Sequence, residues 1–265
     1  YGEFWLDDVN FTEFTPDNST PTQTPTITPT PTITPTPTSP ANVDKFGIKK
    51  IYQTISGGRE WFSKWDNGIT RTFVNSDPND PEFITSNGKG TYKTDGLGIL
   101  KISGTVPRMY VMKPDLTGYW HNVEITIYGR RMSDDNDPDA GIKAFARTNH
   151  VLDANLCDDR GYSGDFNYDG TINFLKEICH GKSYESAGGT GKYWLGGMPY
   201  NTWIGYKFVI YDLANGNVKL ELYIDDTDGL NGGNWKKLTE FTDTGANWGV
   251  GDTPCKIDID PALKL

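Results

Sequence analysis

The chain has 265 residues, a formal net charge of −10 and a sequence pI near 4.8. An acidic chain repels phosphate backbones, and no apolar run reaches the roughly 18–20 residues that cross a bilayer, so we expect neither a nucleic-acid nor a membrane partner. The 30 glycines and the 13% of Phe, Trp and Tyr favour strands and turns over helices.

The first segment, residues 1–14, has the alternation of a β-strand, with Phe4, Leu6 and Val9 set off from polar neighbours. A lone strand cannot fold, so we expect its parent domain to lie upstream. The run Gly-Glu-Phe-Trp-Leu-Asp-Asp-Val resembles the closing strand of carbohydrate-binding β-sandwich modules. This resemblance implies that residues 1–14 end such a module and tether the rest of the chain to it.

Residues 15–42 alternate Pro and Thr over most of their length. Proline fixes φ and removes amide donors, and the segment has no apolar face, so we predict an extended, disordered spacer of at most about 3.1 Å per residue. The segment resembles the linkers of clostridial cellulases and cellulosome components. That resemblance implies a secreted or cell-surface protein that acts on a polymeric target.

Residues 43–265 form the main module, in which short apolar-polar runs follow one another between Gly, Asn, Asp and Pro. Many short strands without helical spacers predict an all-β, two-sheet antiparallel sandwich, and the length suits a concanavalin-like jelly roll. The expected strands are 97–103, 107–112, 121–130, 141–148, 162–168, 171–179, 203–211, 218–225 and 235–241.

Two dipeptides, Asp169-Gly170 and Asn215-Gly216, predict tight hairpins between these strands. Residues from Asp165 onward also resemble the start of a calcium-binding loop. The twelfth position of that loop, which should supply a bidentate carboxylate, is Lys176, so the hairpin is favoured.

Period-two alternation places polar and aromatic side chains together on strands that we expect to be neighbours. A cationic wall on an acidic protein suits an anionic sugar polymer, because Arg and Asn can bind a uronate carboxylate and His or Tyr can then remove the adjacent proton. The catalytic candidates are His150, Arg147, Asn149, Tyr162 and His180. The substrate-binding candidates are Arg130, Tyr128, Phe145, Lys176, Trp194 and Trp203.

This set of residue types resembles jelly-roll polysaccharide lyases such as alginate and glucuronan lyases. The resemblance implies an enzyme that cleaves an acidic polysaccharide by β-elimination, and this is the function we favour. The Gln-x-His motif of alginate lyases is absent, so a non-catalytic carbohydrate-binding module remains an alternative. Its aromatic platforms would come from Tyr119, Trp120, Trp194, Tyr200, Trp203, Trp235 and Trp248.

A glycoside hydrolase is the second alternative, because Glu124, Glu177 and Glu221 lie on expected strands and hydrolysis needs two carboxylates across a cleft. We expect no required cofactor. The acidic stretches 134–139 and 225–228 have two interpretations: they form solvated turns, or one of them binds a structural calcium ion. Cys157, Cys179 and Cys255 allow one disulfide, and the sequence does not choose the pair.

Overall fold

The structure, a computed structural model, describes residues 2–16, 42–85, 89–104, 107–112, 120–134, 137–138, 140–150, 160–179, 182–185, 191–245 and 248. Regular structure in these ranges is β-strand, apart from one short 3-10 turn at Leu230–Gly232. No helix in the described part of the chain has the length and apolarity of a membrane span. The predicted all-β class is confirmed.

The described residues contain seventeen strands, with the following bounds: β1 Gly2–Glu13, β2 Glu60–Phe62, β3 Arg71–Phe73, β4 Ser76–Asp77, β5 Asp80–Thr85, β6 Gly90–Thr94, β7 Leu100–Gly104, β8 Met109–Val111, β9 Val123–Ser133, β10 Gly141–Ala146, β11 Gly161–Asn167, β12 Thr171–Cys179, β13 Lys182–Glu185, β14 Gly191–Lys192, β15 Trp203–Asp212, β16 Val218–Asp225 and β17 Lys236–Asp243.

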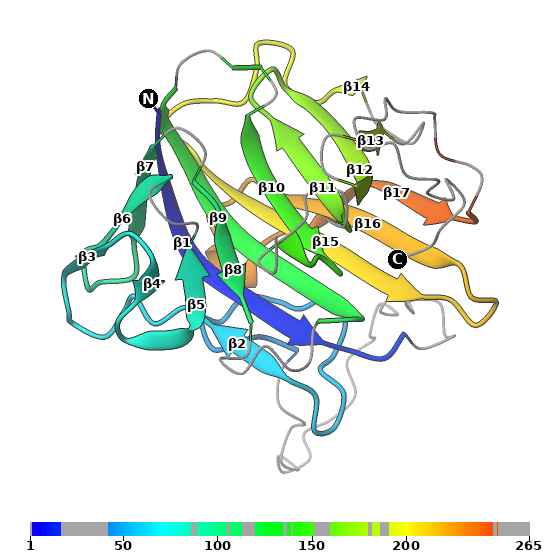
Figure 1. Cartoon of the computed structure of the whole chain (residues 1–265), viewed down its shortest axis with the longest axis horizontal. Coiled ribbons are helices and arrows are strands. Elements are labelled where there is room, and N and C mark those ends of the chain that lie inside the picture. Colours follow the sequence, from blue (N-terminus) through cyan, green and yellow to red (C-terminus); the bar gives the residue numbers. More distant parts are fainter. Residues whose placement is uncertain are drawn as a thin grey trace, which may run out of the picture.

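Two antiparallel sheets form the sandwich. The large sheet has nine strands in the order β17-β16-β15-β9-β1-β7-β6-β3, with β2 also paired to β1. The small sheet has the order β10-β11-β12-β13, with β14 on β12, and it lies across β15 and β16 (Figure 1). A third, three-stranded sheet has the order β4-β5-β8.

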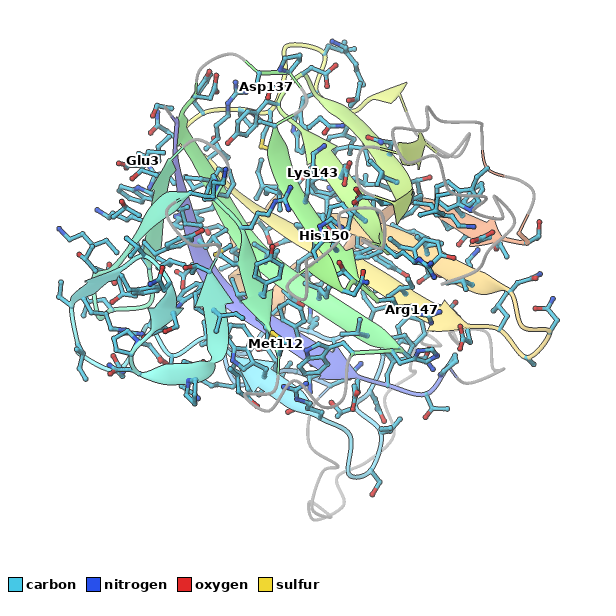
Figure 2. The ribbon with its side chains drawn as sticks, in the orientation of Figure 1. Glu3, Met112, Asp137, Lys143, Arg147 and His150 are labelled. Carbon is cyan, nitrogen blue, oxygen red and sulfur yellow. The ribbon has the colours of Figure 1, made fainter. Side chains whose placement is uncertain are left out.

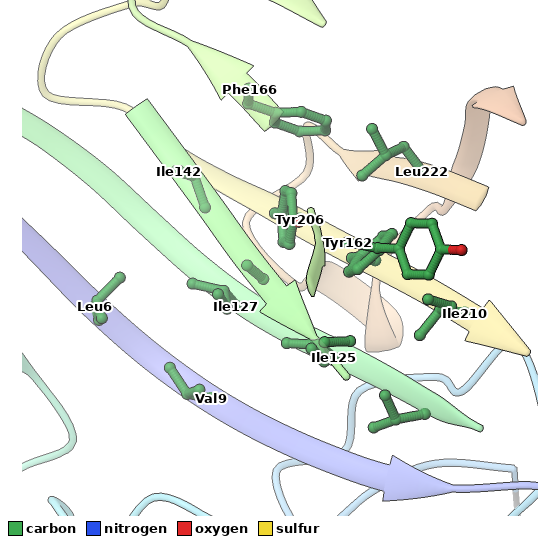
Figure 3. Packing of buried hydrophobic residues seen from close by; sticks show 14 of the residues in the cluster. Leu6, Val9, Ile125, Ile127, Ile142, Tyr162, Phe166, Tyr206, Ile210 and Leu222 are labelled. Carbon is green, nitrogen blue, oxygen red and sulfur yellow. The ribbon is translucent and has the colours of Figure 1, made fainter. Parts of the chain in front are cut away.

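The core lies between the facing sides of the two main sheets (Figure 3). Apolar side chains alternate inward along each strand, as on Ile125 and Ile127 of β9 and on Ile142 of β10. Phe166 of β11 meets Tyr206 of β15 edge to face, with ring centroids 4.9 Å apart. Offset aromatic contacts of this kind add to the free energy of area burial.

Strand β1 corrects the assignment of residues 1–14 to an upstream module. It lies inside the large sheet between β7 and β9, paired with β9 from Glu3↔Ser133 to Glu13↔Val123. Leu6 and Val9 enter the common core (Figure 3). Both edges of β1 are paired with strands of this chain, and its apolar side chains are buried in the core of this sandwich. The proposed spacer, residues 15–42, lies almost entirely outside the described residues.

The outer face of the large sheet is covered in its middle by residues 44–54. The Glu124 carboxylate accepts hydrogen bonds from the backbone N–H groups of Ile51 and Tyr52, at 3.0–3.2 Å, and the Asn10 side chain donates to Asp44. This cover explains why Glu124 is only 1% exposed on a face that alternation alone assigns to solvent.

Each of the nine predicted strands has a counterpart, and the two predicted hairpins join β11 to β12 and β15 to β16. The short strands β2 to β6, β13 and β14 were not predicted. Their two- to six-residue length leaves too few alternations to recognise.

Candidate functional site

The outer face of the small sheet carries a polar row across three strands. Lys143 on β10 lies opposite Asp165 on β11, which lies opposite Asn173 on β12. Lys143 Nζ is 3.2 Å from Asp165 Oδ2, and Ser163 Oγ donates to Asp165 Oδ1 at 2.6 Å. Asp165 is 1% exposed although it faces away from the large sheet. A buried carboxylate on this face needs the cation and the hydroxyl that hold it.

A histidine and a carboxylate meet farther along the same face, beyond the row that contains Phe145 and Ser163. His150 Nε2 lies 2.9 Å from Glu177 Oε2, and the imidazole lies against Phe145 with ring centroids 5.6 Å apart. Both side chains are largely buried. Figure 2 shows His150 and Lys143 over the small sheet. Strand geometry puts Phe145 between them, since it follows Lys143 by two residues, or about 7 Å.

This arrangement brings a lysine, an aromatic ring, a histidine and a carboxylate together on one face of the small sheet. A carboxylate this close to an imidazole stabilises the positive charge that the ring carries once it has taken up a proton. A lysine beside an aromatic ring can bind a carboxylate whose sugar ring rests on the aromatic surface. We name Lys143, Phe145, His150 and Glu177 the outer-face group.

Two predicted site residues lie inside the sandwich instead. Lys176 and Tyr162 are 0% exposed, and both bind Asp243 Oδ2 on β17, at 2.8 Å and 2.5 Å. Ile172, Phe174 and Lys176 do share a face of β12, as alternation predicted, but that face is the packed one. The prediction that Lys176 and Tyr162 line an open wall is wrong. Lys176 was expected to face solvent because it is charged, but the buried Asp243 carboxylate balances that charge inside the sandwich.

Arg147 also leaves the predicted site. Its φ of 54° interrupts the alternation at the end of β10, and its guanidinium donates to Asp212 Oδ1 at 2.8 Å and to the His121 carbonyl oxygen at 3.1 Å. His121 Nε2 lies 2.6 Å from the other oxygen of Asp212. Burial, the largest single influence, raises the pKa of Asp212. The bonds from His121 and Arg147 to its carboxylate together outweigh burial, so the pKa is lowered. Arg147 therefore joins β10 to β15 rather than facing His150.

Asn149 is the neighbour of His150 on the chain, and its Oδ1 accepts a hydrogen bond from the Arg160 backbone N–H at 2.8 Å. It helps to hold the start of β11 against the end of β10. His180, the remaining catalytic candidate, lies outside the described residues.

The predicted substrate-binding residues divide between the two sheets. Tyr128, Arg130 and Trp203 lie on the outer face of the large sheet. Their strands, β9 and β15, belong to that sheet, whereas β10 belongs to the small sheet. Tyr128 is 3% exposed and donates to Asp225 Oδ2 at 2.9 Å. Trp194 packs edge to face on Phe166 and belongs to the rim of the core. Phe145 stays in the outer-face group.

The carboxylates of a hydrolase are not paired in an open cleft. Glu124 and Glu221 lie in one row of the large sheet, on either side of Val209. Glu124 binds Lys207 Nζ at 2.7 Å, and Glu221 accepts from Tyr223 at 2.7 Å and from Lys237 at 2.8 Å. Both are almost fully buried. Glu177 lies on the other sheet, so these three residues do not form a hydrolytic pair.

Within the described ranges, no three His, Cys, Asp or Glu side chains are grouped to hold a metal ion. In the stretch 225–228, the Asp225 carboxylate is bound by Tyr128, by the backbone N–H and hydroxyl of Thr227, and by the backbone N–H groups of Gly229 and Asn234. These hydrogen bonds give the Asp225 carboxylate a structural role, because they hold the loop that follows β16 in its conformation. Stretch 134–139 is described only in part, and Cys157 and Cys255 lie outside the described residues, as does the side chain of Cys179.

Carboxylates crowd where β1 bulges. Asp8 has a φ of 47° and shares this corner with Asp7, Asp44 and Asp228. Burial, followed by the charge of Asp7, raises the pKa of Asp8 to about 7.

No family model matches the chain, and no curated protein and no solved structure is detectably similar to it. Any function must therefore be argued from the geometry described above.

Proposed function

We propose that this protein cleaves a uronate-containing polysaccharide by β-elimination on the outer face of the small sheet. The observation that carries the proposal is the contact of His150 with Glu177, 2.9 Å between Nε2 and Oε2, beside the Phe145 ring. Lys143 supplies the nearby positive charge, and its side chain is 31% exposed. His150, Glu177, Phe145 and Lys143 are thus close together on one face of the small sheet.

The proposed reaction follows from these positions. The uronate carboxylate binds Lys143, which stabilises the negative charge that develops when C5 loses its proton. His150 takes that proton, the C4–C5 double bond forms and the C4–O bond breaks. The imidazolium then returns the proton to the departing oxygen. Glu177 is a positioning residue that stabilises the imidazolium between these two transfers.

The wider setting is part of the same proposal. An antiparallel sandwich with a polar outer face supports a jelly-roll module that binds an extended polymer across its strands. The Pro- and Thr-rich composition of residues 15–42 supports an extracellular setting, because such a segment cannot form a core and suits a spacer outside the cell. The net charge of −10 makes a local cation on the binding face the feature that selects an acidic polymer.

The test is a screen of the full chain against polyuronates, followed by ultraviolet absorbance of the unsaturated product. We expect His150→Gln to lower kcat by about 10²–10⁴-fold, the usual contribution of a positioned base. Glu177→Gln should lower kcat by a smaller factor and leave KM nearly unchanged. Lys143→Gln should both raise KM and lower kcat, because Lys143 binds the carboxylate and stabilises the charge that develops in the transition state.

His121→Gln is the matched control, because His121 is also bound to an aspartate but lies on the Asp212 side of the molecule. It should leave turnover unchanged, and circular dichroism should show that every variant is folded. Reducing ends formed without ultraviolet absorbance would identify a hydrolase instead. Retardation in polysaccharide gels with no product would identify a non-catalytic binding module.

A further inference from the structure

A straight row of cations and tryptophans crosses the outer face of the large sheet. Cross-strand pairing places Lys93 opposite Lys101, Lys101 opposite Trp5, Trp5 opposite Arg130, and Arg130 opposite Trp203. Strands β6, β7, β1, β9 and β15 are consecutive in the large sheet (Figure 1). Directly paired residues point to the same face, so the five side chains project together. We name this set the basic row.

The basic row is an accessible surface. Lys93 is exposed, and the other four side chains are half-buried, while their strand neighbours Tyr92, Leu100 and Leu6 point into the core. Five adjacent strands at about 4.8 Å spacing give the row a length of about 19 Å. That is long enough to contact several consecutive sugar residues of an extended chain.

The members of the row stack on one another. Lys101 Nζ lies 4.1 Å from the centroid of Trp5, and the Arg130 guanidinium lies 5.3 Å from Trp5 and 5.9 Å from Trp203. Cation–π contacts of this kind hold the charged groups near the surface of the sheet. The two tryptophans lie on strands separated by β9, so they are about 10 Å apart, close to the repeat of two pyranose units in an extended polymer.

Within the described residues, no carboxylate forms an ion pair with the charges of the row. In the described part of the chain, Lys93, Lys101 and Arg130 form no ion pair, although 35 Asp and Glu outnumber 25 Lys and Arg in the sequence. The nearest effect on a carboxylate is at Asp228, where the charge of Arg130 opposes the rise in pKa caused by burial and by Asp225. Two lysines directly opposite each other on a sheet repel and so destabilise it.

We propose that the basic row binds a carboxylated polysaccharide chain that runs across the strands of the large sheet, separately from the outer-face group on the small sheet. The cations bind the sugar carboxylates and the tryptophans contact the apolar C–H edges of the rings between them. The proposal rests on the acidic-polysaccharide substrate proposed above, but not on catalysis. A second binding surface would hold the polymer while the outer-face group acts on it.

The test compares Lys93→Gln/Lys101→Gln with the unchanged full chain for binding to polygalacturonate at low salt. We expect Kd to rise about tenfold, and the difference to shrink as salt screens the charges. The variant removes both the repulsive pair and the Lys101–Trp5 contact, whose effects on stability oppose each other, so its thermal stability should be nearly unchanged. Fully methyl-esterified polygalacturonate, which has the same backbone without the charges, should bind weakly to both proteins.

Lys45→Gln/Lys236→Gln is the matched control, since it makes the same change in net charge at lysines already paired with Asp66 and Asp226. It should leave Kd unchanged. Equal losses in both double variants, or equally tight binding of single-stranded DNA, would overturn the proposal, because the row would then act only through general charge.

The two proposals fail differently. If no unsaturated product forms but binding depends on Lys93 and Lys101, elimination is refuted and the basic row stands. If product forms and the double variant keeps both Kd and the KM for long polymers, the row is refuted and elimination stands.

Discussion

Asp8 carries an unfavourable charge in the folded protein. Its left-handed φ of 47° places it at the bulge of β1, where burial and Asp7 raise its pKa from 3.8 to about 7. The folded state therefore holds the proton more tightly than the unfolded state does. The contribution of Asp8 to stability is complete below pH 4 and is lost as the pH rises through 7.

Asp8→Asn should therefore stabilise the protein at pH 8 and have little effect at pH 4. Asparagine tolerates the left-handed conformation and cannot ionise. We expect a gain of about 1–2 kcal/mol in the free energy of unfolding at pH 8, less than the full shift implies because the side chain is partly exposed to water.

Urea denaturation at the two pH values measures this gain. Asp66→Asn, which removes an exposed carboxylate paired with Lys45, is the control and should show no such pH dependence. Equal effects of Asp8→Asn at pH 4 and pH 8 would contradict the assigned electrostatic origin.

Single residues also set the limit of what the sequence could predict about the site. His150 and Phe145 were identified by residue type and remain in the outer-face group, whereas Glu177 could be recognised only as one carboxylate among several. Lys176 was misplaced because its buried partner, Asp243, lies far along the chain. Arg147 was misplaced because one residue with positive φ ends the alternation that the prediction extended through it.

At the scale of elements, β1 is the strand whose neighbours could not be inferred. Its alternation was recognised, but register with β7 and β9 depends on side chains about a hundred residues away, which local periodicity does not encode. The hairpins were predictable because a dipeptide such as Asp169-Gly170 specifies a turn by itself, and Gly170 indeed has a φ of 95°.

Leu6→Ala should destabilise the protein by about 2–5 kcal/mol, because Leu6 is 4% exposed within the common core. Thermal and urea denaturation of the full chain measure the effect. Glu3→Ala, on the same strand but at its solvent-facing end, should cost much less. A Leu6→Ala variant as stable as the parent would mean that β1 does not belong to this sheet.

At the scale of the whole molecule, a buried polar bridge joins the two sheets. Lys176 on β12 and Tyr162 on β11 both bind Asp243 on β17, and all three side chains are almost fully buried. Such a bridge fixes how the small sheet sits on the large one, because any slip would separate the charges in an apolar interior.

Lys176→Met should cost about 3–5 kcal/mol, since it leaves the Asp243 carboxylate buried without its cation. Lys176→Met/Asp243→Asn should recover a large part of that loss, because the amide is neutral and its oxygen still accepts from Tyr162. Equilibrium urea denaturation of the two variants tests this coupling. Additive losses in the double variant would mean that the lysine and the aspartate act independently.

The inner position of β1 also governs how the chain reaches its final form. The ribosome makes β1 before its partners on β7 and β9, which lie about a hundred residues later in the sequence. Until then both edges of β1 expose unpaired amide and carbonyl groups, a template for association with other chains. Closing so long a loop is slow, so the newly made protein passes through a period of vulnerability to aggregation before its largest sheet is complete.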